Sequence, residues 1–379
     1  MPVWGIYIHV PFCPYHCAYC DFDAGVFPAR LRQPYVETVI NEIAHTRANL
    51  YPDGLTADTI YFGGGTPALL TAEQLQQIIE AVHHHFTIAD DPEVTLEANP
   101  ESINEEKAEQ LRRIGINRVS IGAQSFIERH LRQLGRRHTA QDVWACFRIL
   151  REAGLSNLNL DLIIGLPNQS LTEWQYTLDQ ALALRPTHIS AYLLEVHEGT
   201  PLARQLQRGR WPQPDEELSV QMYELLLDRA RAEGYEHYEL SNWALPGFRS
   251  RHNLKYWSDT PYLGFGCSAA SYDWVERRVN VKTPGAYIEQ VGRLGHAIWM
   301  RTPVTQQTRR QEALFLGLRQ IGGINLHQFQ THYGIDVWAE YEEALTPLIE
   351  AGLVSRENGW LKLTRRGLTL SNEVLTVFV

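Results

Sequence analysis

The chain has 379 residues, of which 44% are hydrophobic and 21% are charged, as is typical of a globular protein with a sizeable core. Its 34 basic and 44 acidic residues give a formal net charge of -10, which argues against binding to nucleic acid or to an anionic membrane surface. The N-terminus has no signal-peptide pattern, and no apolar run reaches the roughly 18 residues of a membrane span. These features predict a cytoplasmic protein without a transmembrane segment.

Up to about residue 200, short apolar and β-branched runs alternate with segments of helical period. Thr71 and Thr172, each followed closely by Glu, indicate two helix starts. This βα rhythm predicts an α/β fold, a partial (β/α)6 barrel of the TIM type over residues 1–205. The expected strands are 5–10, 59–64, 94–99, 118–123, 157–165 and 188–195, and the expected helices are 34–50, 71–86, 104–114, 139–153 and 171–184.

Residues 206–304 begin with a connection and a helix to about 232, and we expect them to extend the barrel. From about 305 the pattern changes to three helices, followed by a hairpin marked by Asn358-Gly359. This order predicts a small winged-helix-like C-terminal domain over residues 305–379. The domain has seven Lys and Arg residues against eight Asp and Glu residues, which favours a lid or a protein contact over DNA binding.

Three of the five cysteines, Cys13, Cys17 and Cys20, form a C-x3-C-x2-C run directly after the first expected strand. In a reducing compartment this clustering indicates a metal site rather than disulfides. Two alternatives are a packed group of thiols and a zinc site completed by His9 or His16. The interpretation we favour is an iron–sulfur cube with three thiolate-bound irons and one open iron. Asp21 is a weaker candidate for the open position, because a carboxylate there would add negative charge beside three thiolates.

The cysteine spacing, with Tyr19 before the last cysteine, resembles the signature of the radical S-adenosylmethionine (SAM) superfamily. The resemblance implies a 4Fe-4S cluster whose open iron binds the amino and carboxylate groups of SAM. It also implies a reductant, because an electron from the cluster cleaves SAM to a 5'-deoxyadenosyl radical.

Polar and glycine residues at the ends of the other strands fit the same interpretation, since a βα barrel places its chemistry at the carboxyl ends of its strands. Backbone N–H groups of the run 63–65 can approach a ligand closely, and the resemblance assigns this run to the amino group of SAM. Glu97 suits the ribose hydroxyls, and Arg136 suits the carboxylate. The full set of implied SAM contacts is Tyr7, Tyr19, Gly64, Gly65, Thr66, Glu97, Gln124, Arg136 and Asp161.

The segments YIHVPFCPYHCAYCDF, YFGGGTP, SIGAQSF and DLIIGLP resemble the group of oxygen-independent coproporphyrinogen III dehydrogenases, which includes a family of haem chaperones. In the dehydrogenases a further Cys stands where this chain has Phe22, and a long segment precedes the cysteines. Here 12 residues precede Cys13.

The hexapeptide HNLKYW at 252–257 matches the HNxxYW motif of the haem chaperones. The motif implies His252 as the haem contact, with aromatic faces from Tyr256 and Trp257; Cys267 is a competing soft ligand. The resemblance therefore implies a haem chaperone that binds haem and a SAM-ligated cluster and transfers haem to an unidentified acceptor protein. The alternative is a coproporphyrinogen III dehydrogenase that decarboxylates propionate side chains oxidatively.

Overall fold

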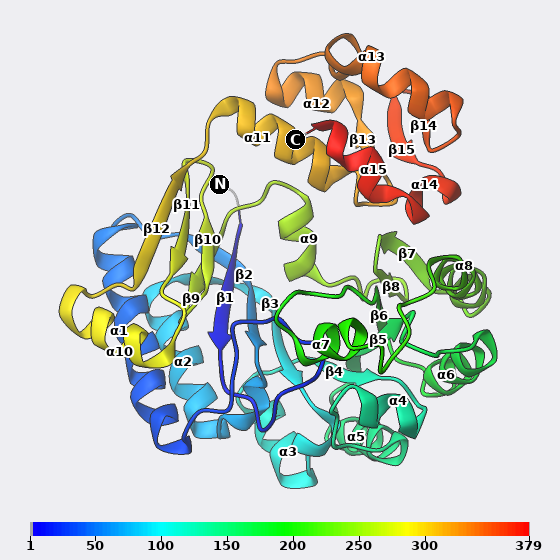
Figure 1. The fold of residues 1–379 in the computed structure, drawn as a ribbon. Helices are drawn as coiled ribbons and strands as arrows, with labels where there is room; N and C mark the ends of the chain where they lie inside the picture. The colour runs from blue at the N-terminus through cyan, green and yellow to red at the C-terminus, as the bar shows by residue number, and fades with distance from the viewer. Residues whose placement is uncertain (1–2, 379) are drawn as a thin grey trace.

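Six parallel strands lie in chain order at the centre of one 12-stranded sheet (Figure 1). The computed structural model describes residues 3–378. Apolar strand residues such as Ile6 and Ile8 are fully buried, because helices cover the outer face of the sheet. The predicted α/β fold with a small C-terminal domain is confirmed. The parallel strands are β1 (Trp4–Val10), β2 (Thr56–Gly64), β3 (Thr87–Ala98), β4 (Arg118–Gln124), β5 (Asn157–Ile164) and β6 (His188–Leu193).

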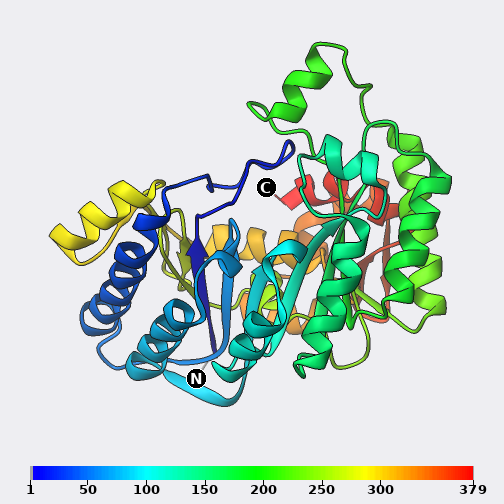
Figure 2. The same cartoon turned by 90° about the horizontal axis from the view of Figure 1, so that it is seen from below.

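The helices between these strands lie outside the sheet in both ribbon views (Figures 1 and 2). The five expected helices are present, with ends within two residues of the prediction, and α4 was not expected. Thr71 caps α2, as predicted. The cap predicted at Thr172 is wrong, because Ser170 accepts the N–H of Glu173 and caps α6. The helices are α1 (Arg32–Asn49), α2 (Ala72–His85), α3 (Glu105–Arg113), α4 (Glu128–Gln133), α5 (Ala140–Glu152) and α6 (Leu171–Ala183).

Residues 206–304 add strands to both edges of the sheet. Strands β8 (Asn242–Ala244) and β7 (Glu236–Glu239) extend the edge at β6, whereas β9 (Tyr262–Phe265) pairs parallel to β1. Antiparallel strands β10 (Ala270–Tyr272), β11 (Glu276–Asn280) and β12 (Ile298–Pro303) continue outward from β9. Helix α7 (Pro201–Gln207) leads into this part of the chain, and its helices are α8 (Glu216–Ala232), α9 (Arg251–Trp257) and α10 (Pro284–Leu294).

The C-terminal domain combines helices with a three-stranded antiparallel sheet of order β13-β15-β14. The expected hairpin turn is present, since Asn358 and Gly359 both have positive φ, at 51° and 78°. None of the helices in residues 3–378 is long and apolar enough to cross a membrane. The elements are α11 (Gln306–Gly317), β13 (Ile324–Asn325), α12 (Leu326–Tyr333), α13 (Val337–Glu350), β14 (Val354–Glu357), β15 (Trp360–Leu363), α14 (Arg365–Thr369) and α15 (Ser371–Leu375).

Candidate metal and cofactor site

The three clustered cysteines lie on the loop that leaves β1, and each is half-buried with a free thiol. Backbone hydrogen bonds hold this loop in place. Gly65 N–H donates to Val10 O at 2.8 Å, and Thr66 N–H donates to Phe12 O at 2.8 Å. The same glycine run needs to be free of side chains, because a Cβ at Gly65 would lie 3.0 Å from Cys13 Sγ. The cysteine loop is therefore fastened to the end of β2 in a fixed conformation.

The buried Arg136 guanidinium lies beside the thiols, with Nη1 3.6 Å from Cys17 Sγ. Its Nη2 donates to Asn99 Oδ1 at 2.9 Å and to Gly122 O at 2.6 Å, whereas its buried Nε has no partner in the described part of the chain. Burial raises the pKa of the Cys13 thiol to about 11. Thiolates that bind iron must lose their protons, so metal binding is coupled to proton release. A cationic neighbour and an unpartnered N–H fit a site for thiolates and an anionic ligand.

The zinc alternative lacks its fourth ligand. His9 uses both ring nitrogens, since Nδ1 lies 3.2 Å from Tyr7 Oη and Nε2 lies 3.0 Å from Asp23 O. His16 is exposed, and Asp21 pairs with His197 at 3.3 Å. Within residues 3–378 no three His, Cys, Asp or Glu side chains converge on a single ion. In an iron–sulfur cluster each thiolate binds a different iron, so the three thiols need not converge on one ion.

A cavity of about 340 Å³ lies beside the cysteine loop. It brings three predicted SAM contacts, Tyr7, Gly64 and Glu97, together with residues of the cysteine loop. Glu97 accepts the hydroxyl of Tyr61 at 2.8 Å and the N–H of Gly64 at 3.1 Å, and burial raises its pKa to about 7. The cavity lies at the carboxyl ends of the first three strands, where the sequence placed the chemistry. Its lining consists of Tyr7, His9, Asp21, Phe22, Asp23, Gly64, Glu97 and Ser268.

The other predicted SAM contacts lie outside the lining of this cavity. Asp161 accepts Ser120 Oγ at 3.1 Å and Asn159 Nδ2 at 2.8 Å, and burial raises its pKa. Gln124 ends β4 with a φ of 67°, a conformation that is costly for residues other than glycine and is common at functional sites. Tyr19 packs against a small apolar group that includes Leu134. Contact with SAM stays a prediction for all nine residues, both the three that line the cavity and Tyr19, Gly65, Thr66, Gln124, Arg136 and Asp161.

One expectation about the glycine run is wrong. The N–H groups of Gly64 and Gly65 donate to Glu97 and to Val10, so they fasten the cysteine loop and Glu97 rather than face a ligand. An amino group is itself a hydrogen-bond donor and needs oxygen acceptors. If this run contacts the amino group of SAM, carbonyl oxygens or the hydroxyl of Thr66 must make that contact.

His252 is not among the residues that line the cavity beside the cysteine loop. His252 lies on α9 and is 1% exposed. Its Nδ1 lies 2.8 Å from Thr59 Oγ1 and its Nε2 lies 2.9 Å from Tyr256 Oη. Its ring stacks on Tyr61 at 5.0 Å, and Tyr61 in turn donates to Glu97. His252 is therefore one aromatic layer away from the cavity, and burial lowers its pKa to about 3, which keeps the imidazole neutral.

Cys267 is fully buried, and its Sγ lies 3.6 Å from the hydroxyl of Tyr35. Burial raises the pKa of this thiol to about 12. Sequence reasoning missed Tyr61, Asp23 and Ser268 as parts of the site, although Asp23 follows Cys20 by three residues. Tyr61 could have been found, because it lies two residues before Gly63 and therefore on the same face of β2. Ser268 carries no comparable signal.

Comparisons with known proteins agree with this geometry. The sequence matches the radical SAM superfamily over residues 7–181 and the HemN C-terminal domain over residues 304–370. The structure is similar to that of the coproporphyrinogen III oxidase HemN from Escherichia coli, with a TM-score of 0.87 and 23% identity, over 100% of this chain and 90% of that chain. The fold and the site thus define a radical SAM protein, a class that implies a 4Fe-4S cluster and SAM.

Relatives named heme chaperone HemW include proteins from Bacillus subtilis and Mycobacterium tuberculosis. The Bacillus subtilis protein is 35% identical over 98% of both chains. The Mycobacterium tuberculosis protein is 36% identical over 98% of this chain and 94% of its own length. The chain belongs to the HemW family of radical SAM proteins, which confirms the family resemblance seen in the sequence.

Proposed function

We propose that the protein is a haem chaperone that binds haem, carries a SAM-ligated 4Fe-4S cluster and passes haem to an acceptor protein. The observation that carries this proposal is the similarity to HemW proteins over 98% of the chain. Phe22 supports it, since this exposed aromatic residue lines the cavity at the position where the dehydrogenase pattern continues with a further Cys.

In this proposal Cys13, Cys17 and Cys20 hold the cluster, which together with SAM supplies one-electron chemistry. Arg136 offsets the negative charge of the thiolates and offers its unpartnered Nε to the SAM carboxylate. Glu97 accepts the ribose hydroxyls, and its ionised form is the stronger acceptor.

His252 is the proposed haem ligand. A neutral imidazole nitrogen is the form that binds haem iron, and burial keeps the His252 ring neutral. With the proton on Nδ1, the ring donates to Thr59, and Nε2 keeps the lone pair that accepts the hydroxyl of Tyr256. The Thr59 contact orients the ring, as partners of metal-bound histidines commonly do. Ligation then requires that one hydrogen bond, between Nε2 and Tyr256, be broken.

The second candidate function, oxidative decarboxylation of coproporphyrinogen III, is favoured by the fold shared with HemN. The two functions are separated by incubating the reconstituted protein with coproporphyrinogen III, SAM and a reductant, followed by chromatography of the porphyrins. The chaperone proposal predicts no accumulation of protoporphyrinogen. Product formed over many turnovers would overturn it.

A further inference from the structure

His252 is enclosed on both faces, and the two sides of its enclosure differ. On the barrel side the ring stacks on Tyr61, and a Cβ at Gly5 would lie 3.1 Å from the ring. On the other side the hydroxyl of Tyr256 contacts Nε2, and Tyr256 lines a second cavity, of about 150 Å³. Glu312, Ala313 and Leu316 of α11 form one wall of this cavity. A single side chain therefore separates the proposed haem ligand from a space between α9 and the C-terminal domain.

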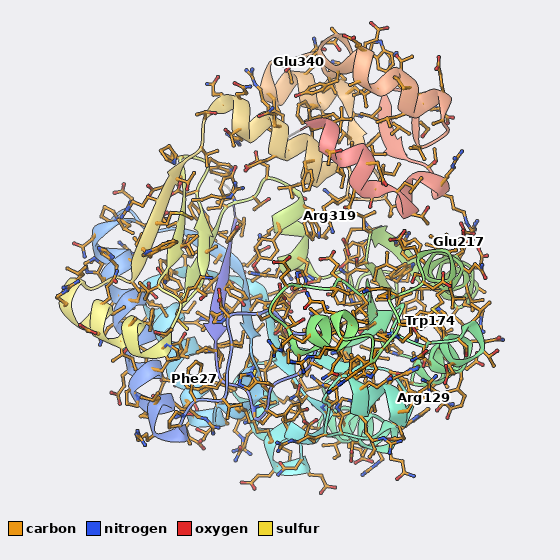
Figure 3. All side chains as sticks on the ribbon, viewed as in Figure 1. Phe27, Arg129, Trp174, Glu217, Arg319 and Glu340 are labelled. Atoms are coloured by element: carbon orange, nitrogen blue, oxygen red, sulfur yellow. The ribbon has the colours of Figure 1, made fainter. Side chains whose placement is uncertain are left out.

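The C-terminal domain has the properties of a body that can move as a unit. Its buried core is formed by residues 313–378, and Leu240 is the one buried residue that joins this core from elsewhere in the described chain. Two of its contacts with α9 involve polar groups. Arg319, labelled in Figure 3, places its guanidinium 4.6 Å over the ring of Trp257. Gln320 Nε2 donates to Trp257 O at 2.9 Å. Two backbone hydrogen bonds, from Leu240 N–H to Arg319 O and from Ile321 N–H to Tyr238 O, both at 3.1 Å, attach the domain at β7. A largely separate core is typical of domains that move relative to each other.

One carboxylate fastens this domain to the turn after α9. Asp259 Oδ2 accepts Arg309 Nε of α11 at 2.8 Å and Tyr333 Oη of α12 at 2.7 Å. Its Oδ1 accepts the hydroxyl of Tyr272 on β10. We call these four residues, Asp259, Arg309, Tyr333 and Tyr272, the Asp259 clamp. The clamp closes the space next to Tyr256, since Asp259 and Tyr272 both line the second cavity.

We propose that the C-terminal domain is a lid over α9, held closed by the Asp259 clamp, and that haem reaches His252 from the side of α9 and α11. This inference rests on the proposed function. The cavity of about 150 Å³ is smaller than the roughly 300–1,000 Å³ of ordinary ligand pockets, so the lid must move outward before a porphyrin can enter. Loosening the clamp should therefore speed the binding of haem.

The test is stopped-flow mixing of haem with the reconstituted full-length protein and its Asp259→Asn variant. The substitution keeps the size of the side chain and removes the charge that Arg309 pairs with. We expect haem association to be about tenfold faster, which corresponds to about 1.4 kcal/mol of lost lid closure. The matched control is Arg365→Gln, which breaks a different attachment of the same domain, to Glu224 and Asp228 of α8. The clamp would be refuted if haem association with Asp259→Asn stayed within about twofold of the wild-type rate, or if Arg365→Gln accelerated haem association equally.

Hydrogen exchange without haem separates this inference from the proposed function. Asp259→Asn should raise amide exchange in α9 and α11 and leave α6 unchanged. If the wild type binds no haem but exchange rises as expected, the haem proposal fails and the moving domain stands. If the wild type binds haem and the variant changes neither rate nor exchange, the lid inference fails alone.

Discussion

Replacing Tyr256 by Phe removes the hydroxyl that lies 2.9 Å from His252 Nε2 and keeps the aromatic ring. This hydrogen bond must break before Nε2 can bind haem iron. A neutral buried hydrogen bond contributes about 0.5–1.5 kcal/mol net, and about 1.4 kcal/mol corresponds to a tenfold change in affinity. Tyr256→Phe should therefore bind haem about 2- to 12-fold more tightly than the wild type, measured by anaerobic titration of the Soret band.

Thr59, which contacts the other nitrogen of the His252 ring, supplies the matched control. Thr59 is fully buried and lies 2.8 Å from Nδ1, and Thr59→Val keeps its shape while removing the hydroxyl. Loss of a residue that orients a metal ligand typically costs 10- to 100-fold in metal affinity, so this variant should bind haem more weakly. Circular dichroism checks that both variants are folded. Weaker binding by Tyr256→Phe, or a change of the same sign in both variants, would refute this assignment of the two nitrogens.

Three further outcomes follow from the cluster and cavity. Burial raises the pKa of the Glu97 carboxyl to about 7, so this group ionises as the pH rises through about 7. SAM affinity, measured by calorimetry, should therefore increase from about pH 6 to about pH 8, and Glu97→Gln should abolish this pH dependence. The same pH dependence in the variant would exclude Glu97 as a SAM contact. Arg136→Lys removes the guanidinium that lies 3.6 Å from Cys17 Sγ, and it should lower the iron content after reconstitution to less than about half of the wild-type value. Full iron content with an unaltered electron paramagnetic resonance spectrum would contradict the role of Arg136 beside the cluster. Gly65→Ala should prevent cluster assembly, because its Cβ would lie 2.8 Å from a backbone oxygen of the cysteine loop. The control Gly292→Ala in α10 has open space around its Cβ, so it should retain the cluster and add about 0.4–1 kcal/mol of stability. Equal iron content in both variants would show that the cysteine loop does not need a glycine at position 65.

The central part of the fold was predictable because each βα unit carries its own local pattern. The strands at the sheet edges were not, since β7 to β12 are three to six residues long. The two that join the central sheet, β8 and β9, pair with β6 and β1, which are distant in the chain. Helix α9 is also short, with seven residues and a cap from Ser250. The misplaced cap at Thr172 has a simple reason. A capping box needs its acidic residue three positions after the hydroxyl, and Ser170 with Glu173 has this spacing, whereas Thr172 with Glu173 does not.

The site was predictable to the extent that its residues are neighbours in the chain. The cysteine run is local, so its spacing alone indicated a cluster. The stacking of His252 on Tyr61 joins α9 to β2, and no local pattern reports such a contact. For the same reason the sequence implied His252 as the haem contact without indicating its burial, whereas in the structure this side chain is 1% exposed.

The central claim is that this radical SAM protein carries haem through His252. Its most direct test is an anaerobic haem titration of the reconstituted wild type and of His252→Ala, followed at the Soret band. We expect the wild type to saturate at about one haem per chain, and the variant to bind at least about tenfold more weakly with an altered Soret band, because removing a first ligand costs more than removing its partner. Absence of saturable haem binding by the wild type would contradict the chaperone function, and an unchanged titration of His252→Ala would remove His252 from the haem site.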